Sequence, residues 1–139
     1  MTLQQAKTIA KTKGFTLRHR DGEYRVNLIG GTEQTAYYTD DRQDAVDTGS
    51  VMALSKLVTD MRTAVDATVK AFCEADDANF LSSMKFIRHQ LDGMLAPIAA
   101  TTPIDPEYDH PGEILYHEVR QHLRGMDLII RLREMREVR

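Results

Sequence analysis

The residues best placed for binding chemistry lie in one short stretch that runs from Arg18 to Arg25. Asp21-Gly22 predicts a two-residue hairpin turn, because both positions accept positive φ. Such a turn fixes the register of the flanking strands and places Arg18 opposite Arg25. Like charges opposite each other destabilise a sheet modestly. The pair is tolerated if water screens it, if a carboxylate reaches over, or if an anion binds between the guanidinium groups.

Two interpretations of this strand face remain open. It can be a solvated surface on which Glu23 or Glu33 balances the arginines. It can instead be a binding face for phosphate groups or for an acidic protein surface. If Ala36 and Tyr38 point inward, Tyr37 joins this face. The outward side chains would then be Thr16, Arg18, Arg20, Arg25, Asn27 and Tyr37.

Catalytic and metal-binding signatures are not found in the sequence. His117 and His122 are five positions apart rather than four, so they diverge around a helix and cannot share one metal ion. Cys73 is the only cysteine, and there is no phosphate-binding glycine loop or nucleophile elbow. We therefore expect a protein that is not an enzyme and that binds no metal and no cofactor.

Local patterns predict the elements that position the arginines. A helix over residues 3–13 begins with a capping box of Thr2 and Gln5 and ends at Gly14. Period-two alternation then predicts strands over 15–20, 23–28 and 35–39. Asp40 or Asp41 caps a following helix with a small-residue face. Residues 1–53 thus form an expected α-βββ-α module, and the fold class is α+β with a helical C-terminal part.

Residues 54–139 are expected to form a helical bundle. Apolar residues recur at helical spacing along three segments, and the last of these begins near Glu113 and includes Leu132 in its buried stripe. A helix ending before Pro97 precedes a proline-rich loop at about 97–112. The bundle could be completed by the preceding helix or by a second copy of the chain, so a homodimer is one expected state.

The net charge of −3 is unevenly distributed. Residues 1–39 carry six bases and three acids, a net of +3, whereas residues 40–79 carry nine acids and four bases, a net of −5. This asymmetry indicates two surfaces with different partners. The first residues are too polar for a signal peptide, and no apolar run reaches membrane-spanning length, so we expect a soluble cytoplasmic protein without membrane contacts.

The segment GEYRVN…TAYYTDD…DAV, within residues 22–46, is similar to a small module of uncharacterised proteins from proteobacterial plasmids, integrative elements and prophages. The chain as a whole resembles the small non-enzymatic anti-defence proteins of such elements, among them anti-CRISPR proteins. That resemblance implies binding to a Cas subunit or blockage of its nucleic-acid groove. Residues 15–53 also resemble DNA-binding modules of the AP2 and integrase arm-binding type, in which Arg18, Arg20 and Arg25 would be the matching side chains.

Two functional hypotheses follow. The first is a protein-binding inhibitor that places acidic helix surfaces, with Asp60, Asp66 and Asp76, on a basic nucleic-acid-binding protein such as a Cas subunit. The second is a DNA-binding accessory protein that uses the basic sheet. The net charge of −3 disfavours nonspecific affinity for DNA, because neutralisation of phosphates dominates that affinity.

Overall fold

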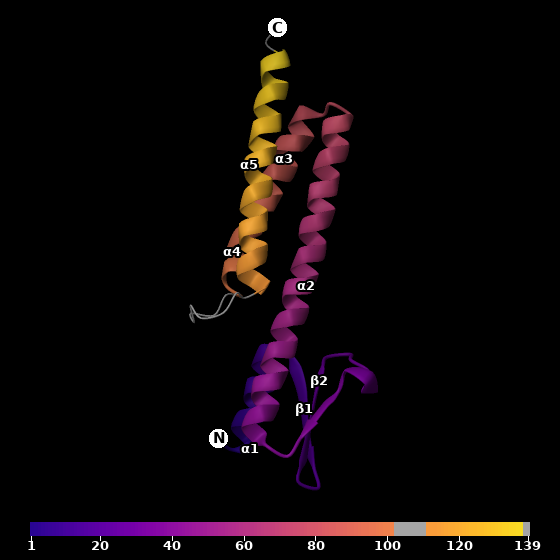
Figure 1. The fold of residues 1–139 in the computed structure, drawn as a ribbon, viewed down its shortest axis with the longest axis vertical. Coiled ribbons are helices and arrows are strands. Elements are labelled where there is room, and N and C mark those ends of the chain that lie inside the picture. Colours follow the sequence, from indigo (N-terminus) through magenta and orange to yellow (C-terminus); the bar gives the residue numbers. More distant parts are fainter. Residues whose placement is uncertain (102–110, 138–139) are drawn as a thin grey trace. The chain divides into compact units, whose positions relative to one another are not determined.

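The structure is a computed structural model, and it describes residues 1–101 and 111–137. The chain has an α+β fold that divides into two compact units, Met1–Leu57 and Val58–Arg139. The division falls within a single long helix, α2 (Figure 1). The elements are α1 (Leu3–Lys13), β1 (Phe15–Arg20), β2 (Glu23–Leu28), the 3₁₀ turn η1 (Glu33–Thr35), β3 (Tyr37–Thr39), α2 (Arg42–Asp77), α3 (Leu81–Asp92), α4 (Leu95–Ala99) and α5 (Pro111–Glu137).

The predicted hairpin is confirmed residue by residue. Strands β1 and β2 pair antiparallel, with Arg18 opposite Arg25 and Leu17 opposite Val26. Asp21 and Gly22 both have positive φ, of 51° and 78°, as the predicted turn requires. The predicted ends of α1 are also confirmed, because the Thr2 capping box forms and Gly14 adopts a left-handed conformation.

This turn gives a first stability prediction. Gly22→Val should lower the free energy of unfolding by about 1 kcal/mol or more, because a β-branched residue resists positive φ. Chemical denaturation of both proteins measures the difference. An unchanged unfolding midpoint would contradict the view that this turn determines the register of the hairpin.

The third strand differs from the prediction. Thr35 belongs to η1, and β3 contains only Tyr37–Thr39. Tyr37 lies opposite Val26 and Tyr38 opposite Arg25. The expectation that Tyr38 points inward was therefore wrong: Tyr38 shares the face of Arg25, whereas Tyr37 lies on the face of Val26. The period of two makes a one-residue shift exchange the two faces of the strand.

The other face of the sheet forms the core of the first unit with the two helices. Phe15, Tyr24 and Val26 are buried against Ala10 of α1 and Ala45 of α2. Asp41 caps α2, because its Oδ1 accepts from the backbone N–H of Gln43 at 2.8 Å. Close contact with the sheet requires Gly49, since a Cβ atom built there would lie 2.4 Å from ring carbons of Phe15.

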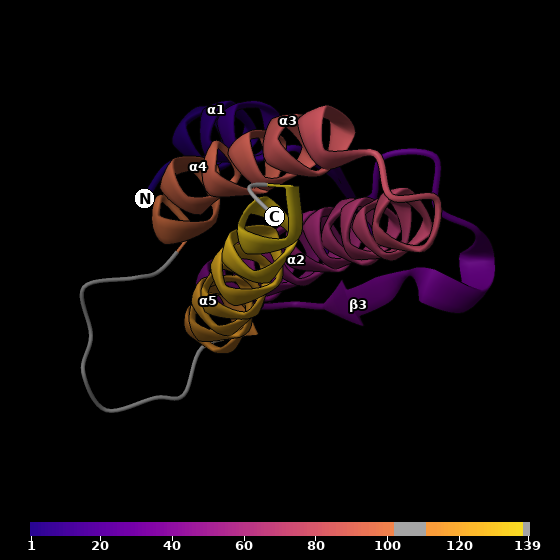
Figure 2. The ribbon, with the colours of Figure 1, turned by 90° about the horizontal axis from the view of Figure 1, so that it is seen from above.

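The second unit is helical. Helices α3 and α4 contact α5 (Figure 2), and the α2 residues of this unit contribute Val58, Val65 and Phe72 to its core. The largest fully buried side chains of the unit include Met84, Leu91, Ile98, Leu115 and Val119.

Ion pairs connect the helices of this unit. Arg133 Nε lies 2.7 Å from Asp76 Oδ1, and Arg62 pairs with Glu118, so both contacts join α2 to α5. Arg88 Nε lies 2.9 Å from Asp127 Oδ1, which joins α3 to α5. No helix within the described residues is long and apolar enough to cross a membrane.

The expected loop at 97–112 is partly helical. Helix α3 ends at Asp92, before Gly93, and α4 includes Pro97. Helix α5 begins at Pro111, two residues before Glu113, near which its start was expected. A proline is tolerated in the first turn of a helix because the N–H that it lacks has no partner there. Residues 102–110 of the expected loop lie outside the described residues.

Candidate binding surfaces

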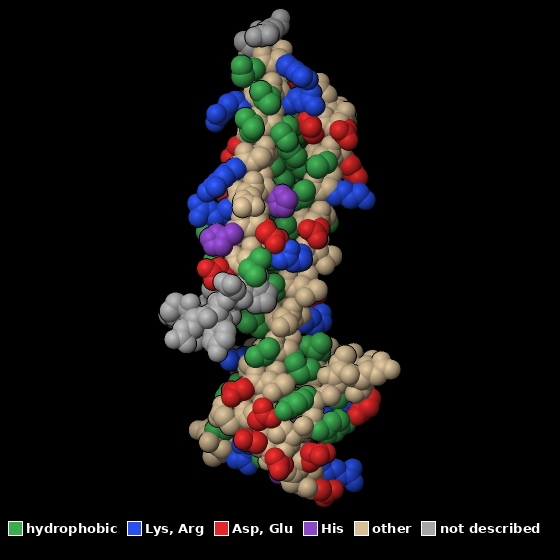
Figure 3. Space-filling view, viewed as in Figure 1, with side chains coloured by type: hydrophobic (Ala, Val, Ile, Leu, Met, Phe, Trp, Pro, Cys, Tyr) green, Lys and Arg blue, Asp and Glu red, His purple; other side chains and the backbone are tan. Residues whose placement is uncertain are grey.

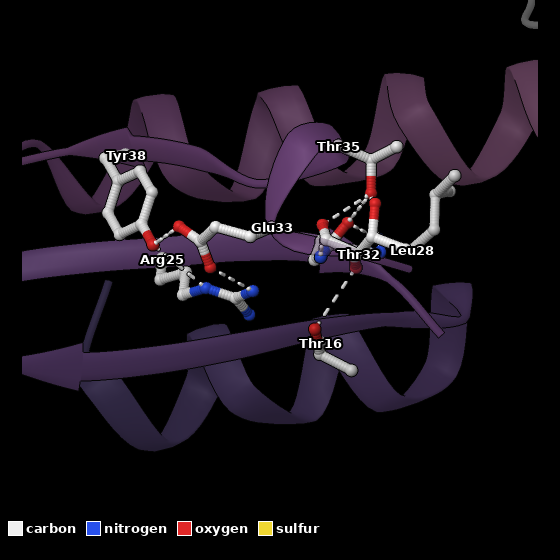
Figure 4. A network of polar contacts seen from close by, with 8 residues as sticks. Thr16, Arg25, Leu28, Thr32, Glu33, Thr35 and Tyr38 are labelled. Atoms are coloured by element: carbon white, nitrogen blue, oxygen red, sulfur yellow. Dashed lines mark hydrogen bonds and ion pairs between the residues drawn. The ribbon is translucent and has the colours of Figure 1, made fainter. Parts of the chain in front are cut away.

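A carboxylate reaches over the opposed arginines on the outer face of the sheet. Arg25 Nη2 lies 3.0 Å from Glu33 Oε2, and Arg25 Nε donates to the Tyr38 hydroxyl at 3.2 Å. The Tyr38 hydroxyl in turn donates to Glu33 (Figure 4). The opposed arginines could be tolerated through water, a carboxylate or a bound anion, and for Arg25 the structure shows a carboxylate, that of Glu33. Arg25 is thus occupied by contacts within its own chain.

This network changes the protonation of its members. The Tyr38 hydroxyl and then the Arg25 guanidinium hold the pKa of Glu33 below its ordinary value. The same contacts raise the pKa of Arg25, Tyr38 first and Glu33 second. A carboxyl with a lowered pKa in the folded state stabilises the fold above its unfolded pKa, and that contribution is lost as the pH falls.

The pH dependence of unfolding tests this network. We expect a small part of the stability of the first unit to be present at neutral pH and to be lost as the pH falls through the lowered pKa of Glu33. Glu33→Gln should remove that part of the dependence. Urea midpoints of both proteins at neutral and acid pH provide the measurement, and an identical slope in the variant would contradict the assignment.

Beside this network the sheet face is hollowed. The hollow has a volume of about 530 Å³ and is lined by Arg18, Arg20, Asp21, Glu23, Arg25 and Tyr38. Arg20 Nε lies 3.7 Å from Asp21 Oδ2, and both side chains are almost fully exposed. Three arginines thus face two lining carboxylates, with Glu33 as a third next to them. Such a balanced surface attracts phosphate much less than three unpaired arginines would.

Asn27 lies opposite Thr16 on the outer face of the sheet, as expected, but it is buried there and is not available for binding. Only 2% of its surface is exposed, because the segment from Gly31 to Thr35 covers it. Its Nδ2 donates to Thr32 O at 2.9 Å, and its Oδ1 accepts from Leu28 N at 2.9 Å and from Thr35 Oγ1 at 2.7 Å. The Asn27 amide holds the chain between β2 and β3 together and has no surface to offer a partner.

Tyr37 also has a structural contact instead of a place beside the arginines. Its hydroxyl donates to Asp44 Oδ2 at 2.6 Å, in the first turn of α2. This bond is the first cause that raises the pKa of Tyr37 and lowers the pKa of Asp44. Of the six expected outward residues, the hollow therefore brings together only Arg18, Arg20 and Arg25, and Tyr38 takes the place of Tyr37.

The acidic residues expected on a helix surface do not form one patch. Asp60, Asp66 and Asp76 lie six and ten positions apart on α2, spacings that do not return to one face of a helix with about 3.6 residues per turn. Asp76 is engaged with Arg133, and Asp60 also takes part in an interaction within the chain. Asp66 is exposed near Arg62.

Helix α5 carries an exposed apolar stripe that the sequence did not predict. Leu128, Leu132 and Met135 are 57%, 53% and 55% exposed. Leu132 was expected in the buried stripe, but it is exposed, whereas Met126 and Ile130 are buried. We call Gly125, Leu128, Leu132 and Met135 the α5 seam. Their spacing of three, four and three residues was the signal available in the sequence, since it matches the a and d positions of a heptad.

The described residues contain no group of three or more His, Cys, Asp or Glu side chains that could hold a metal ion. A comparison of the chain with protein-family models, curated proteins and solved structures finds no match. The two surfaces described above are thus the basis for a functional proposal.

Proposed function

We propose that this protein acts by binding another protein and does not catalyse a reaction. The observation that carries the proposal is the α5 seam, where three large apolar side chains are each more than half exposed on one helix face. Exposed apolar side chains that line up along one surface mark a contact site more often than scattered ones do. Figure 3 shows hydrophobic side chains gathered along this part of α5.

The resemblance of residues 22–46 to modules of mobile elements gives this proposal its specific form. In that form the chain is an inhibitor, of the anti-CRISPR type, that binds a Cas subunit and blocks its effector complex. DNA binding by the sheet is less well supported, because Arg25 is engaged by Glu33 and the hollow is close to electrically balanced. The contact surface that we favour is α5 rather than the acidic side chains of α2.

Dose dependence tests the inhibitor proposal. The chain should be expressed in a panel of bacterial strains, each of which contains one CRISPR effector complex that targets a phage. In at least one strain the phage should again form plaques. With the purified complex, inhibition should saturate at about one chain per complex, because a binding protein acts stoichiometrically. Complete inhibition by far fewer chains than there are complexes would indicate catalysis. No effect on any complex, in cells or in purified form, would contradict the inhibitor proposal.

A seam variant connects the assay to the surface. Leu128→Glu with Leu132→Glu should abolish inhibition, since a buried unpaired charge is costly at an interface. Phe86→Glu is the matched control, because Phe86 is 62% exposed on α3 and does not belong to the seam. Equal inhibition by both variants would place the contact elsewhere on the molecule.

A further inference from the structure

The charges along the α5 seam indicate what kind of partner it fits. With Gly125 and Leu132 at a positions and Leu128 and Met135 at d positions, the four flanking e and g positions follow from the sequence. They are occupied by Arg124, Ile129, Arg131 and Arg136. The three arginines are exposed and form no ion pair with any residue that the structure describes, and no carboxylate occupies a flanking position. The seam is thus apolar along its centre and basic along its edges.

We infer that the α5 seam binds an amphipathic helix of a different protein, one with leucine-like side chains at its a and d positions and acidic side chains beside them. The inference rests on the proposed protein-binding function and specifies the partner. In paired helices, the residues at e and g positions determine which partner and which orientation is accepted. Partner carboxylates at those positions would meet Arg124, Arg131 and Arg136.

A second copy of the chain is the poorer occupant. If two α5 helices paired antiparallel, g positions would face g positions and arginine would face arginine. If they paired parallel, Arg131 would face Arg136 of the other copy across the g to e contact. Both orientations therefore place like charges together at the edges of the seam, and such contacts select against self-association.

An anionic membrane is also a poorer occupant. A helix that lies in a membrane surface needs a broad apolar face, because binding grows with the apolar area that it buries. The seam is a narrow strip, since the opposite side of α5 is buried with Leu115, Val119 and Met126. Two carboxylates on α5, Asp127 and Glu134, are occupied in ion pairs to α3. A strip with two apolar positions in every seven is the width of a helix-pairing seam.

Gly125 gives the seam room for close approach. A Cβ atom built on Gly125 would meet nothing within 4 Å, so the backbone of α5 is open to a neighbour there. Glu118, one heptad earlier, is engaged with Arg62 of α2 and interrupts the apolar strip. The partner helix is therefore expected to cover α5 from about residue 124 to residue 136.

A designed peptide tests the inference without knowledge of the natural target. The probe is a dye-labelled helix of about three heptads with Leu at a and d and Glu at e and g. A second peptide carries Lys at e and g, and vesicles of phosphatidylcholine and phosphatidylserine are a third probe. Fluorescence anisotropy and vesicle sedimentation measure binding to the full chain, and analytical ultracentrifugation measures self-association. We expect binding of the Glu peptide alone, by a chain that remains monomeric.

Two variants locate the binding. Leu132→Glu should weaken binding of the Glu peptide at least about tenfold, as expected for a central contact residue. Phe86→Glu should not change it, and circular dichroism should show both variants folded.

The inference is overturned if the Glu peptide does not bind, if the Lys peptide binds as tightly, or if Leu132→Glu and Phe86→Glu behave alike. It is also overturned if the seam binds the vesicles or forms a dimer that Leu132→Glu dissociates. Because the peptide assay contains no effector complex, its result is independent of the inhibition assay. If the peptide binds but no effector complex is inhibited, the proposed inhibitor function is rejected, whereas the α5 seam is retained as a helix-binding site.

Discussion

Asn27→Ala should lower the free energy of unfolding by about 2–4 kcal/mol, a large share of the stability of a small domain. The change removes three hydrogen bonds and leaves Leu28 N–H without the acceptor that the Asn27 amide supplies, whereas Thr32 C=O keeps the bond from Thr35 N–H. A buried backbone group without a partner costs about 1–3 kcal/mol. Urea denaturation measures the loss, and hydrogen exchange of the β2 amides locates it in the first unit.

Gln34→Ala is the control for this prediction. Gln34 is exposed in the same segment, and its side chain forms no hydrogen bond with any residue that the structure describes. We expect its stability to remain within about 0.5 kcal/mol of the original. A folded Asn27→Ala protein of unchanged stability would contradict the structural role.

Gly49→Ala and Gly125→Ala should change stability in opposite directions. Both glycines are inside helices, where alanine is favoured by about 1 kcal/mol. At Gly49 the new Cβ would be 2.4 Å from the buried ring of Phe15, and overpacking of a core costs about 1–3 kcal/mol. At Gly125 the Cβ meets nothing. The two variants should therefore differ by about 2 kcal/mol, with Gly125→Ala the more stable.

Thermal unfolding of the two glycine variants beside the original chain makes this comparison. The identical chemical change at both sites removes the difference in side-chain type. If Gly49→Ala were as stable as Gly125→Ala, the close contact of α2 with β1 would not exist as described. The predicted small-residue face of α2 would then have no packing role.

Local signals predicted the register of the hairpin but assigned the side chains of the third strand to the wrong faces. Asp21-Gly22 determines the register because the turn geometry depends on those two residues alone. The path into β3 depends instead on Asn27, which contacts Thr32 and Thr35 several residues later in the chain. Alternation along residues 35–39 contains no information about those contacts. The prediction was therefore one residue out of phase, and Tyr37 and Tyr38 exchanged faces.

The candidate surface on α5 could not be assigned from periodicity either. Met126 and Ile130 recur at helical spacing, and so do Leu128 and Leu132. Helical spacing shows that both pairs form stripes, but it does not show which stripe α3 and α4 cover. The structure resolves this, because Met126 and Ile130 are buried and Leu128 and Leu132 are not. The acidic residues of α2 show a related limit of composition. A segment rich in acidic residues need not carry them on one helix face, and Asp60, Asp66 and Asp76 lie on different faces of α2.

A charge swap is the most direct measurement of how the α5 seam selects a partner. A chain with Arg124→Glu and Arg131→Glu keeps the apolar seam and reverses the charge of the two arginines on its g edge. We expect this chain no longer to bind the peptide with Glu at e and g. It should bind the peptide with Lys at e and g at least about tenfold more tightly than the original chain does. Lys70→Glu, at an exposed position of α2, should leave the original preference unchanged. If the swapped chain and the original chain prefer the same peptide, the arginines do not select the partner and the account is wrong.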